Sequence, residues 1–194
     1  MAPVYLALAV LTLVLILLDL ASVRWAFPLD RHLSHLMIRA RTREETKLMH
    51  WASVVGGPYG IIIVAILATF GLAVFGRPLD AVFYLMVVVL SVAYALSMKV
   101  LTARKRPNHG IEKQRTYSFP SAHSLTSAVM YISLGILLAG SLIGDIVLIL
   151  CIALVLAIGV SRVYLGVHYP SDVLGGYVAG GVWVWIFLYL VAGT

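Results

Sequence analysis

Six long apolar stretches, each about 20 residues in length, constrain this chain more than any other feature of its sequence. They are residues 4–23, 58–75, 81–98, 121–142, 145–164 and 172–191. A helix needs about 20 mainly apolar residues to cross the hydrocarbon core of a bilayer, so each stretch has the length of a span. The sequence therefore predicts an all-α integral membrane protein, a six-transmembrane-helix bundle forming one membrane-embedded domain over residues 1–194.

The composition excludes the common soluble classes. The chain is 62% hydrophobic and 11% charged, whereas soluble domains contain about 25% charged residues. A soluble globule of this size needs more polar side chains to cover its surface. A soluble enzyme and a nucleic-acid-binding domain are therefore poor interpretations, despite the net charge of +6. The single cysteine, Cys151, excludes an intrachain disulfide, and we expect it to be buried in its apolar stretch.

The connections between the predicted spans differ in length, and only the longer ones can hold a site. Residues 76–80 and 142–145 are short, whereas residues 25–57, 99–120 and 165–171 are longer. With six helices, both ends of the chain lie on one face of the membrane, the terminal face. By the same parity, the three longer segments lie together on the opposite face, called the loop face below.

The basic residues lie almost entirely on the loop face. Of the 14 lysines and arginines, only Arg77 is on the terminal face. A basic surface beside a bilayer favours anionic headgroups or a phosphorylated substrate. Membrane topology alone produces the same distribution, because Lys and Arg collect on the cytoplasmic side.

The segment between the first two spans has an amphipathic pattern. Apolar residues repeat at the spacing of one helical face at Leu33, Leu36, Met37 and Ala40. Thr42 and Glu45 then have capping-box spacing, which predicts the start of a second short helix. A pair of amphipathic helices in the headgroup plane fits this pattern. An ordinary loop packed on the bundle fits it equally.

Three motifs follow in the rest of the chain. They are KVLTARKRP at residues 99–107, PSAH at residues 120–123 and SRVYLGVHYPSD at residues 161–172. These resemble the signature motifs K-x6-R-P, P-S-x-H and S-R-x5-H-x3-D of the type 2 phosphatidic acid phosphatase superfamily. One position differs, since Ala122 stands where the second motif usually has glycine. A methyl group there is tolerable in helical backbone and strained at positive φ.

The residue types in the motifs suit phosphate binding without the resemblance. Three of them are cations, and guanidinium groups match the geometry of a phosphate well. The second motif begins the fourth predicted span, where a serine hydroxyl and the free N–H groups of a helix N-terminus form an anion site. The residues that we expect to bind phosphate are Lys99, Arg106, Ser121, Ala122 and Arg162.

The resemblance implies separate catalytic roles for two histidines. The histidine of the third motif, His168, is implied as a nucleophile that forms a phosphohistidine. Asp172, four residues further on, can hold the other ring nitrogen. The histidine of the second motif, His123, is implied as the general acid for the leaving oxygen. A metal-dependent route needs a carboxylate cluster, and only Asp172 among the eight acidic residues lies in a motif, so we expect no metal or other cofactor.

The sequence and the resemblance together predict a metal-independent membrane phosphatase that hydrolyses a phosphomonoester or diphosphate on a lipid. Small bacterial enzymes that act on undecaprenyl diphosphate or phosphatidylglycerol phosphate are the most similar members, and phosphatidic acid or a lipid A phosphate are further candidates. Two alternatives are a phosphatase of a small soluble phosphate ester and a non-catalytic lipid-binding or transport protein. The oligomeric state is not predicted, and no nucleic-acid partner is expected.

Two indications disagree on which side of a bacterial inner membrane the loop face lies. Bacterial relatives mostly act outside the cytoplasm, and on that resemblance we expect an extracytoplasmic site. Ten basic residues nevertheless lie on the loop face besides the three predicted phosphate ligands. The positive-inside rule would place such a face in the cytoplasm.

Three further features have no role in this mechanism. Arg104 lies between two motif residues, and we expect it to face solvent or headgroups, with contact to the substrate as the alternative. Asp19, within the first span, is either a functional charge or a partner of Arg24 or of another helix. Gly176 and Gly180 have G-x-x-x-G spacing, which predicts close helix packing.

Overall fold

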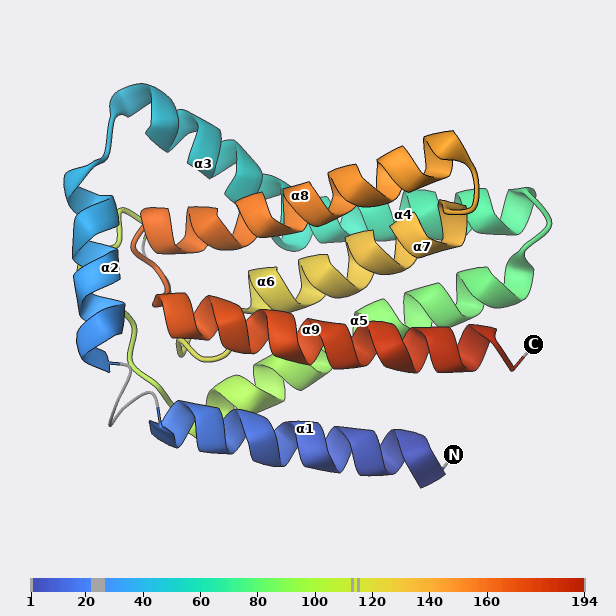
Figure 1. Cartoon of the computed structure of the whole chain (residues 1–194), viewed down its shortest axis with the longest axis horizontal. Helices are drawn as coiled ribbons and strands as arrows, with labels where there is room; N and C mark the ends of the chain where they lie inside the picture. The colour runs from blue at the N-terminus through green and yellow to red at the C-terminus, as the bar shows by residue number, and fades with distance from the viewer. Residues whose placement is uncertain (1, 22–26, 113, 115, 194) are drawn as a thin grey trace.

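The computed structural model describes residues 2–21, 27–112, 114 and 116–193, and the regular structure in these residues is helical (Figure 1). Its elements are α1 (Ala2–Ala21), α2 (Phe27–Arg39), α3 (Arg43–Val55), α4 (Pro58–Val74), α5 (Pro78–Thr102), α6 (Ala122–Ser127), a π-helical turn η2 (Ala128–Ile132), α7 (Ser133–Leu138), α8 (Leu142–Tyr164) and α9 (Pro170–Val191). Each predicted span therefore overlaps helix. The fourth one is α6, η2 and α7 in succession, and it ends at Leu138, so the next connection is residues 139–141 rather than the predicted 142–145. The predicted end of the first span, residues 22–23, lies outside the described residues, as does Arg24.

Three of these helices, α5, α8 and α9, are long and apolar enough to cross a membrane on their own. The pair α3 and α4 passes the same test together, with a bend of 50° between its two parts. The helix over residues 122–138 is apolar but shorter. The structure thus has the helical architecture of a membrane protein, and the number of six crossings stays a prediction.

Local sequence signals determine where several helices begin. Helices α4, α5 and α9 each begin with a proline, whose fixed φ suits the first helical position. Thr42 is the N-cap of α3, and its side chain accepts a hydrogen bond of 3.3 Å from the backbone N–H of Glu45. The predicted second short helix is therefore confirmed, with its start at the predicted cap.

Most of the helices run roughly along one axis, whereas α2 lies across it and α3 is oblique to it (Figure 1). Helix α1 begins and α9 ends at the same end of the bundle, and α2 lies across the opposite end. The described residues of the segments 103–121 and 165–169 also lie at the α2 end. The three longer segments are therefore together, as the parity of the predicted spans requires.

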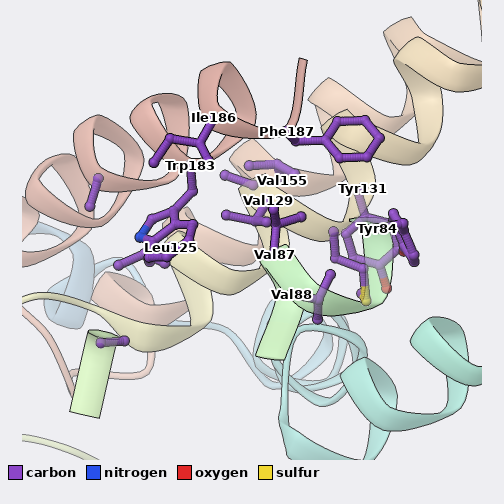
Figure 2. Close-up of a cluster of buried hydrophobic side chains, with 14 of the residues drawn as sticks. Tyr84, Val87, Val88, Leu125, Val129, Tyr131, Val155, Trp183, Ile186 and Phe187 are labelled. Carbon is purple, nitrogen blue, oxygen red and sulfur yellow. The ribbon is translucent and has the colours of Figure 1, made fainter. Parts of the chain in front are cut away.

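The core forms around the central helix α6–η2–α7. Figure 2 shows Leu125, Val129 and Tyr131 of this helix among side chains of α5, α8 and α9. In a membrane such packing is stabilised by van der Waals contact more than by the exclusion of water. Cys151 packs against this core but is only partly buried, so the prediction of a buried thiol is wrong in degree.

Helices α6 and α9 approach each other closely because of two glycines. A Cβ atom at Gly180 would lie 2.7 Å from the Cβ of Ala128, and one at Gly176 would lie 2.8 Å from the backbone oxygen of Ser121. A side chain at either position would therefore push the helices apart. The G-x-x-x-G pair is confirmed as a packing device, and it acts within the chain.

Helix α2 packs against the bundle through two small polar residues, whereas its basic residues Arg31 and Arg39 are exposed. Asp30 and Ser34 are buried, whereas Leu29, Leu33 and Leu36 are exposed. Leu33 and Leu36 of the predicted apolar face are thus exposed and Met37 is partly buried, and the interfacial amphipathic segment stays a prediction. The burial of Asp30 is explained by its partners, described next.

Candidate active site

The motif residues converge at the α2 end of the bundle. Lys99 lies in the last turn of α5, Arg162 in the last turn of α8, and Ser121 is the N-cap of α6. His168 lies in the short connection before α9, and Asp172 in the first turn of α9. Two loops and four helix ends thus build one site.

The centre of the site is a buried histidine–carboxylate pair. The Nδ1 atom of His168 lies 3.3 Å from Oδ2 of Asp172, and both side chains are almost completely buried. The other ring nitrogen, Nε2, lies 3.1 Å from Nη1 of Arg106. With Nδ1–H donating to the carboxylate, the lone pair of the ring is on Nε2. The structure therefore presents Nε2 to a cationic environment that can hold an anion.

The surroundings keep this histidine neutral. Burial lowers the pKa of His168 well below its ordinary value, and the nearby charges of Arg106, Lys99 and Arg162 lower it further. A neutral imidazole has the free electron pair that a nucleophile needs.

Asp172 is held by three donors besides the histidine. The backbone N–H of Tyr169 donates to Oδ2 at 2.8 Å, and the hydroxyl of Ser118 donates to the same oxygen. The Nη1 group of Arg104 donates to Oδ1 at 2.8 Å. These donors use both carboxylate oxygens and fix the side chain in position.

The prediction that Arg104 faces solvent or headgroups is wrong. Its side chain is only 4% exposed and joins Asp172 to Asp30 of α2, where its Nη2 donates at 2.8 Å. Ala103, with a left-handed φ of 48°, ends α5, and the chain turns there. A buried guanidinium requires partners, and two carboxylates supply them.

Asp30 extends this network to the start of α9. It accepts hydrogen bonds from the backbone N–H of Ser171 at 3.0 Å and from the Ser171 hydroxyl at 2.5 Å. Asp19 of α1 lies close enough to interact electrostatically with Arg104 and Asp172, so it borders the same network.

Two of the predicted phosphate ligands also hold the loop before α6. Lys99 donates from Nζ to the backbone oxygens of Tyr117 at 2.8 Å and Ser118 at 3.3 Å. Arg106 donates from Nε to the backbone oxygen of Thr116 at 2.7 Å. These bonds hold two of the three cations beside His168.

The third cation, Arg162, has partners that the motifs do not reveal. Its Nη1 group donates to the hydroxyl of Ser53 on α3 and lies 3.5 Å from Oε2 of Glu112. Ser53, Glu112, Ser118 and Asp30 were all missed by sequence reasoning. Only Asp30 left a signal, since it lies four residues before Ser34 and forms a polar stripe on α2 with it.

The second motif adopts helical geometry. Ala122 is the first residue of α6, so the alanine in place of glycine is accommodated without strain. The backbone N–H of Ser121 donates to the backbone oxygen of Asp172 at 2.9 Å and links the starts of α6 and α9. The Ser121 hydroxyl accepts from the N–H of Ser124 at 3.4 Å.

His123 borders an apolar cavity of about 300 Å³ that opens between α4, α5 and α6. It lies near enough to Arg162 and His168 to interact with their charges. Its cavity is lined by Gly56, Pro58, Ile61, Ile62, Val92, Leu96, Ala122 and Thr126. His123 thus lines an apolar cavity, whereas His168 belongs to the polar centre of the site. Among the described residues no three His, Cys, Asp or Glu side chains are placed to share a metal ion, and metal independence stays a prediction.

A histidine–carboxylate pair beside three cations, at one end of an apolar helical bundle, defines a membrane protein with a site for an anionic group. The sequence profile of the PAP2 superfamily matches residues 80–193, which contain all three motifs and more than half of the chain. The chain belongs to the PAP2 superfamily.

Curated relatives match part of the chain. Phosphatidylglycerophosphatase B of Bacillus subtilis is 35% identical over 89 residues, which are 43% of this chain and 44% of that protein. Decaprenylphosphoryl-5-phosphoribose phosphatase of Mycobacterium tuberculosis is 38% identical over 93 residues, 45% of this chain and 48% of that protein. The matched regions thus span less than half of the length of these relatives.

Two solved structures share the fold. The crystal structure of a transmembrane PAP2-type phosphatidylglycerolphosphate phosphatase from Bacillus subtilis superposes with a TM-score of 0.87 at 23% identity, over 95% of this chain and 96% of that one. The crystal structure of Aquifex aeolicus LpxE gives a TM-score of 0.68 at 21% identity, over 83% of this chain and 95% of that one. The likeness covers nearly the whole chain and shows a membrane PAP2 fold.

Proposed function

We propose that this protein is a membrane lipid phosphatase that works through a phosphohistidine on His168. The observation that carries the proposal is the orientation of its ring, with Nδ1 on Asp172 and Nε2 toward Arg106. Membership of the superfamily and the phosphatase names of the relatives support it.

The first step transfers the phosphoryl group to the enzyme. The lone pair of His168 Nε2 forms a P–N bond while the P–O bond to the lipid breaks. Lys99, Arg106 and Arg162 neutralise the charge on the phosphoryl oxygens. Asp172 stabilises the ring as it becomes positively charged.

The second histidine handles the protons. His123 donates a proton to the departing lipid oxygen. A water molecule then gives a proton back to His123 and attacks phosphorus. The P–N bond breaks, which releases inorganic phosphate and restores neutral His168.

The apolar cavity at His123 supports a lipid as the leaving group. A second apolar cavity of about 280 Å³ lies between α4 and α5 and shares Ile61, Ile62 and Val92 with the first one. Together the two cavities form an apolar path that leads from His123, the proposed general acid, along α4 and α5. A lipid tail fits such a path, whereas a small soluble phosphate ester gains nothing from it. Undecaprenyl diphosphate and phosphatidylglycerol phosphate are the substrates that we propose to test first.

The proposed membrane arrangement has six crossings. Helix α1 and the helix over residues 122–138 provide two crossings, and α4, α5, α8 and α9 provide four. Helix α2 then lies in the headgroup plane, since its leucines are exposed while Asp30 and Ser34 meet the bundle.

We propose an extracytoplasmic site in a bacterial inner membrane. Asn108 is exposed on the loop face, so Asn108→Cys in a Cys151→Ser background gives a topology probe. Labelling by a membrane-impermeant maleimide in intact cells supports the proposal. Labelling only in broken membranes places the site in the cytoplasm, as the excess of basic residues would favour.

Phosphate release from a panel of lipids by the purified protein in detergent tests the function. The expected result is release that persists in excess EDTA, is inhibited by vanadate as an analogue of the transition state, and is lost in His168→Ala. Binding of lipids without phosphate release would favour the lipid-binding or transport alternative. Preference for soluble esters over every lipid would identify a soluble-ester phosphatase.

A further inference from the structure

Glu112 lies inside the proposed phosphate site and has no part in the mechanism above. It belongs to the loop between α5 and α6. Its Oε2 atom lies 3.5 Å from Nη1 of Arg162, and its Oε1 atom lies 3.1 Å from Nδ1 of His50 on α3. The side chain is 25% exposed, whereas that of Arg162 is 1% exposed.

Arg162 therefore has its charge partner already. A buried guanidinium without a counter-charge is costly, and Glu112 is the carboxylate in contact with it. The Ser53 hydroxyl accepts from the same Nη1 group, whereas the Nε of Arg162 is buried with no hydrogen-bond partner among the described residues. The guanidinium thus has unused capacity for an anion.

A phosphate and the carboxylate of Glu112 compete for this guanidinium. Both are anions, and at contact distance in a partly desolvated site their repulsion is substantial. Glu112 also borders a polar cavity of about 390 Å³, lined by Arg106, Asn108 and Gln114 among others. This cavity gives the carboxylate a place to move without leaving its loop.

We propose that Glu112 is a built-in counter-ion, which neutralises Arg162 in the empty site and gives way when a phosphate group binds. It thereby weakens the binding of substrate and of released phosphate. The proposal rests on the proposed function, because it takes the site of Arg162 to be the phosphate site. Glu112 acts through Arg162 and is a positioning residue, since it does not touch the reacting atoms.

Glu112→Gln tests the proposal, because glutamine keeps the size and removes the charge. Glu44→Gln is the matched control, since it also exchanges a glutamate for glutamine, at the start of α3, where Glu44 is exposed and paired with Lys47. Without phosphate, Glu112→Gln should lower the melting temperature, because Arg162 loses its counter-charge. With inorganic phosphate, its melting temperature should rise more steeply than that of the wild type.

The proposal also predicts the direction in which the kinetic constants change. Glu112→Gln should lower both KM and the inhibition constant of inorganic phosphate by about five-fold, a typical effect of one nearby charge. The turnover number should not rise, because released phosphate leaves more slowly. Glu44→Gln should match the wild type in every measurement.

Contrary results are easily recognised. A higher KM together with weaker phosphate binding would mean that Glu112 only anchors the loop, and would overturn the proposal. Unchanged phosphate binding would overturn it as well. Because the melting experiment needs no turnover, a wild-type protein that binds phosphate but releases none from lipids would refute the proposed function alone.

Discussion

Replacing Arg104 by glutamine removes the guanidinium that joins Asp30 to Asp172. The two carboxylates are only 4% and 0% exposed, so neither can recover its lost partner from water. Removing one partner of a buried ion pair costs about 3–5 kcal/mol. In a chain of this size each kcal/mol corresponds to about 2–4 °C, so the melting temperature should fall by about 10 °C.

Thermal unfolding in detergent, followed by tryptophan fluorescence, measures this change. Lys47→Gln is the control, because Lys47 and Glu44 form an exposed pair that should contribute almost nothing. Adding Asp30→Asn to the Arg104→Gln variant should recover part of the loss, since one unpaired carboxylate is then neutral. Equal melting temperatures for Arg104→Gln and Lys47→Gln would show that the Asp30–Arg104–Asp172 network does not stabilise the protein.

Three more predictions concern the site and the packing beneath it. Arg106→Gln should move the acid limb of the kcat/KM profile to higher pH. Burial and the charge of Arg106 both lower the pKa of His168, so the pKa rises when that charge is lost. An acid limb that stays in place would contradict the assignment of this limb to His168. His123→Ala should lose much more activity with a lipid than with p-nitrophenyl phosphate, whose leaving group needs less protonation, and equal losses would argue against a general acid. Gly176→Ala should lower the melting temperature and the activity, since its Cβ would meet a backbone oxygen at the start of α6, whereas Gly181→Ala has open space and should behave as the wild type in both assays.

The sequence predicts the parts of this protein that depend on local signals. Apolar stretches locate the helices. The four-residue spacing of His168 and Asp172 also predicts their contact, because His168 lies just before α9 and Asp172 lies in its first turn. The contact of Arg104 with Asp30 is of another kind, since 74 positions separate the two residues and no local pattern encodes such a pairing. The left-handed Ala103 at the end of α5 is equally invisible, because alanine carries no signal for that conformation.

The leucines of α2 predict a helix at the membrane surface, but they do not predict how this helix is attached to the bundle. Asp30 contributes to this attachment by bonds to Arg104 and Ser171. Glu112 and Ser53 escape prediction for the same reason, because each meets Arg162 across a large separation in sequence. What the sequence lacks is therefore the set of partners that fix the motif residues in place.

The attachment of α2 has a practical consequence for enzymology. Its leucines are exposed on one side, and its aspartate is bonded to the network around Asp172 on the other. We therefore expect the surroundings of these leucines to act, through Asp30 and Arg104, on Asp172, which contacts the His168 ring. The choice of micelle or nanodisc becomes a kinetic variable rather than a detail of purification. The turnover number should be measured in both environments for the wild type and for Asp30→Asn. The difference between micelle and nanodisc should be smaller in Asp30→Asn if α2 couples the membrane surface to the site.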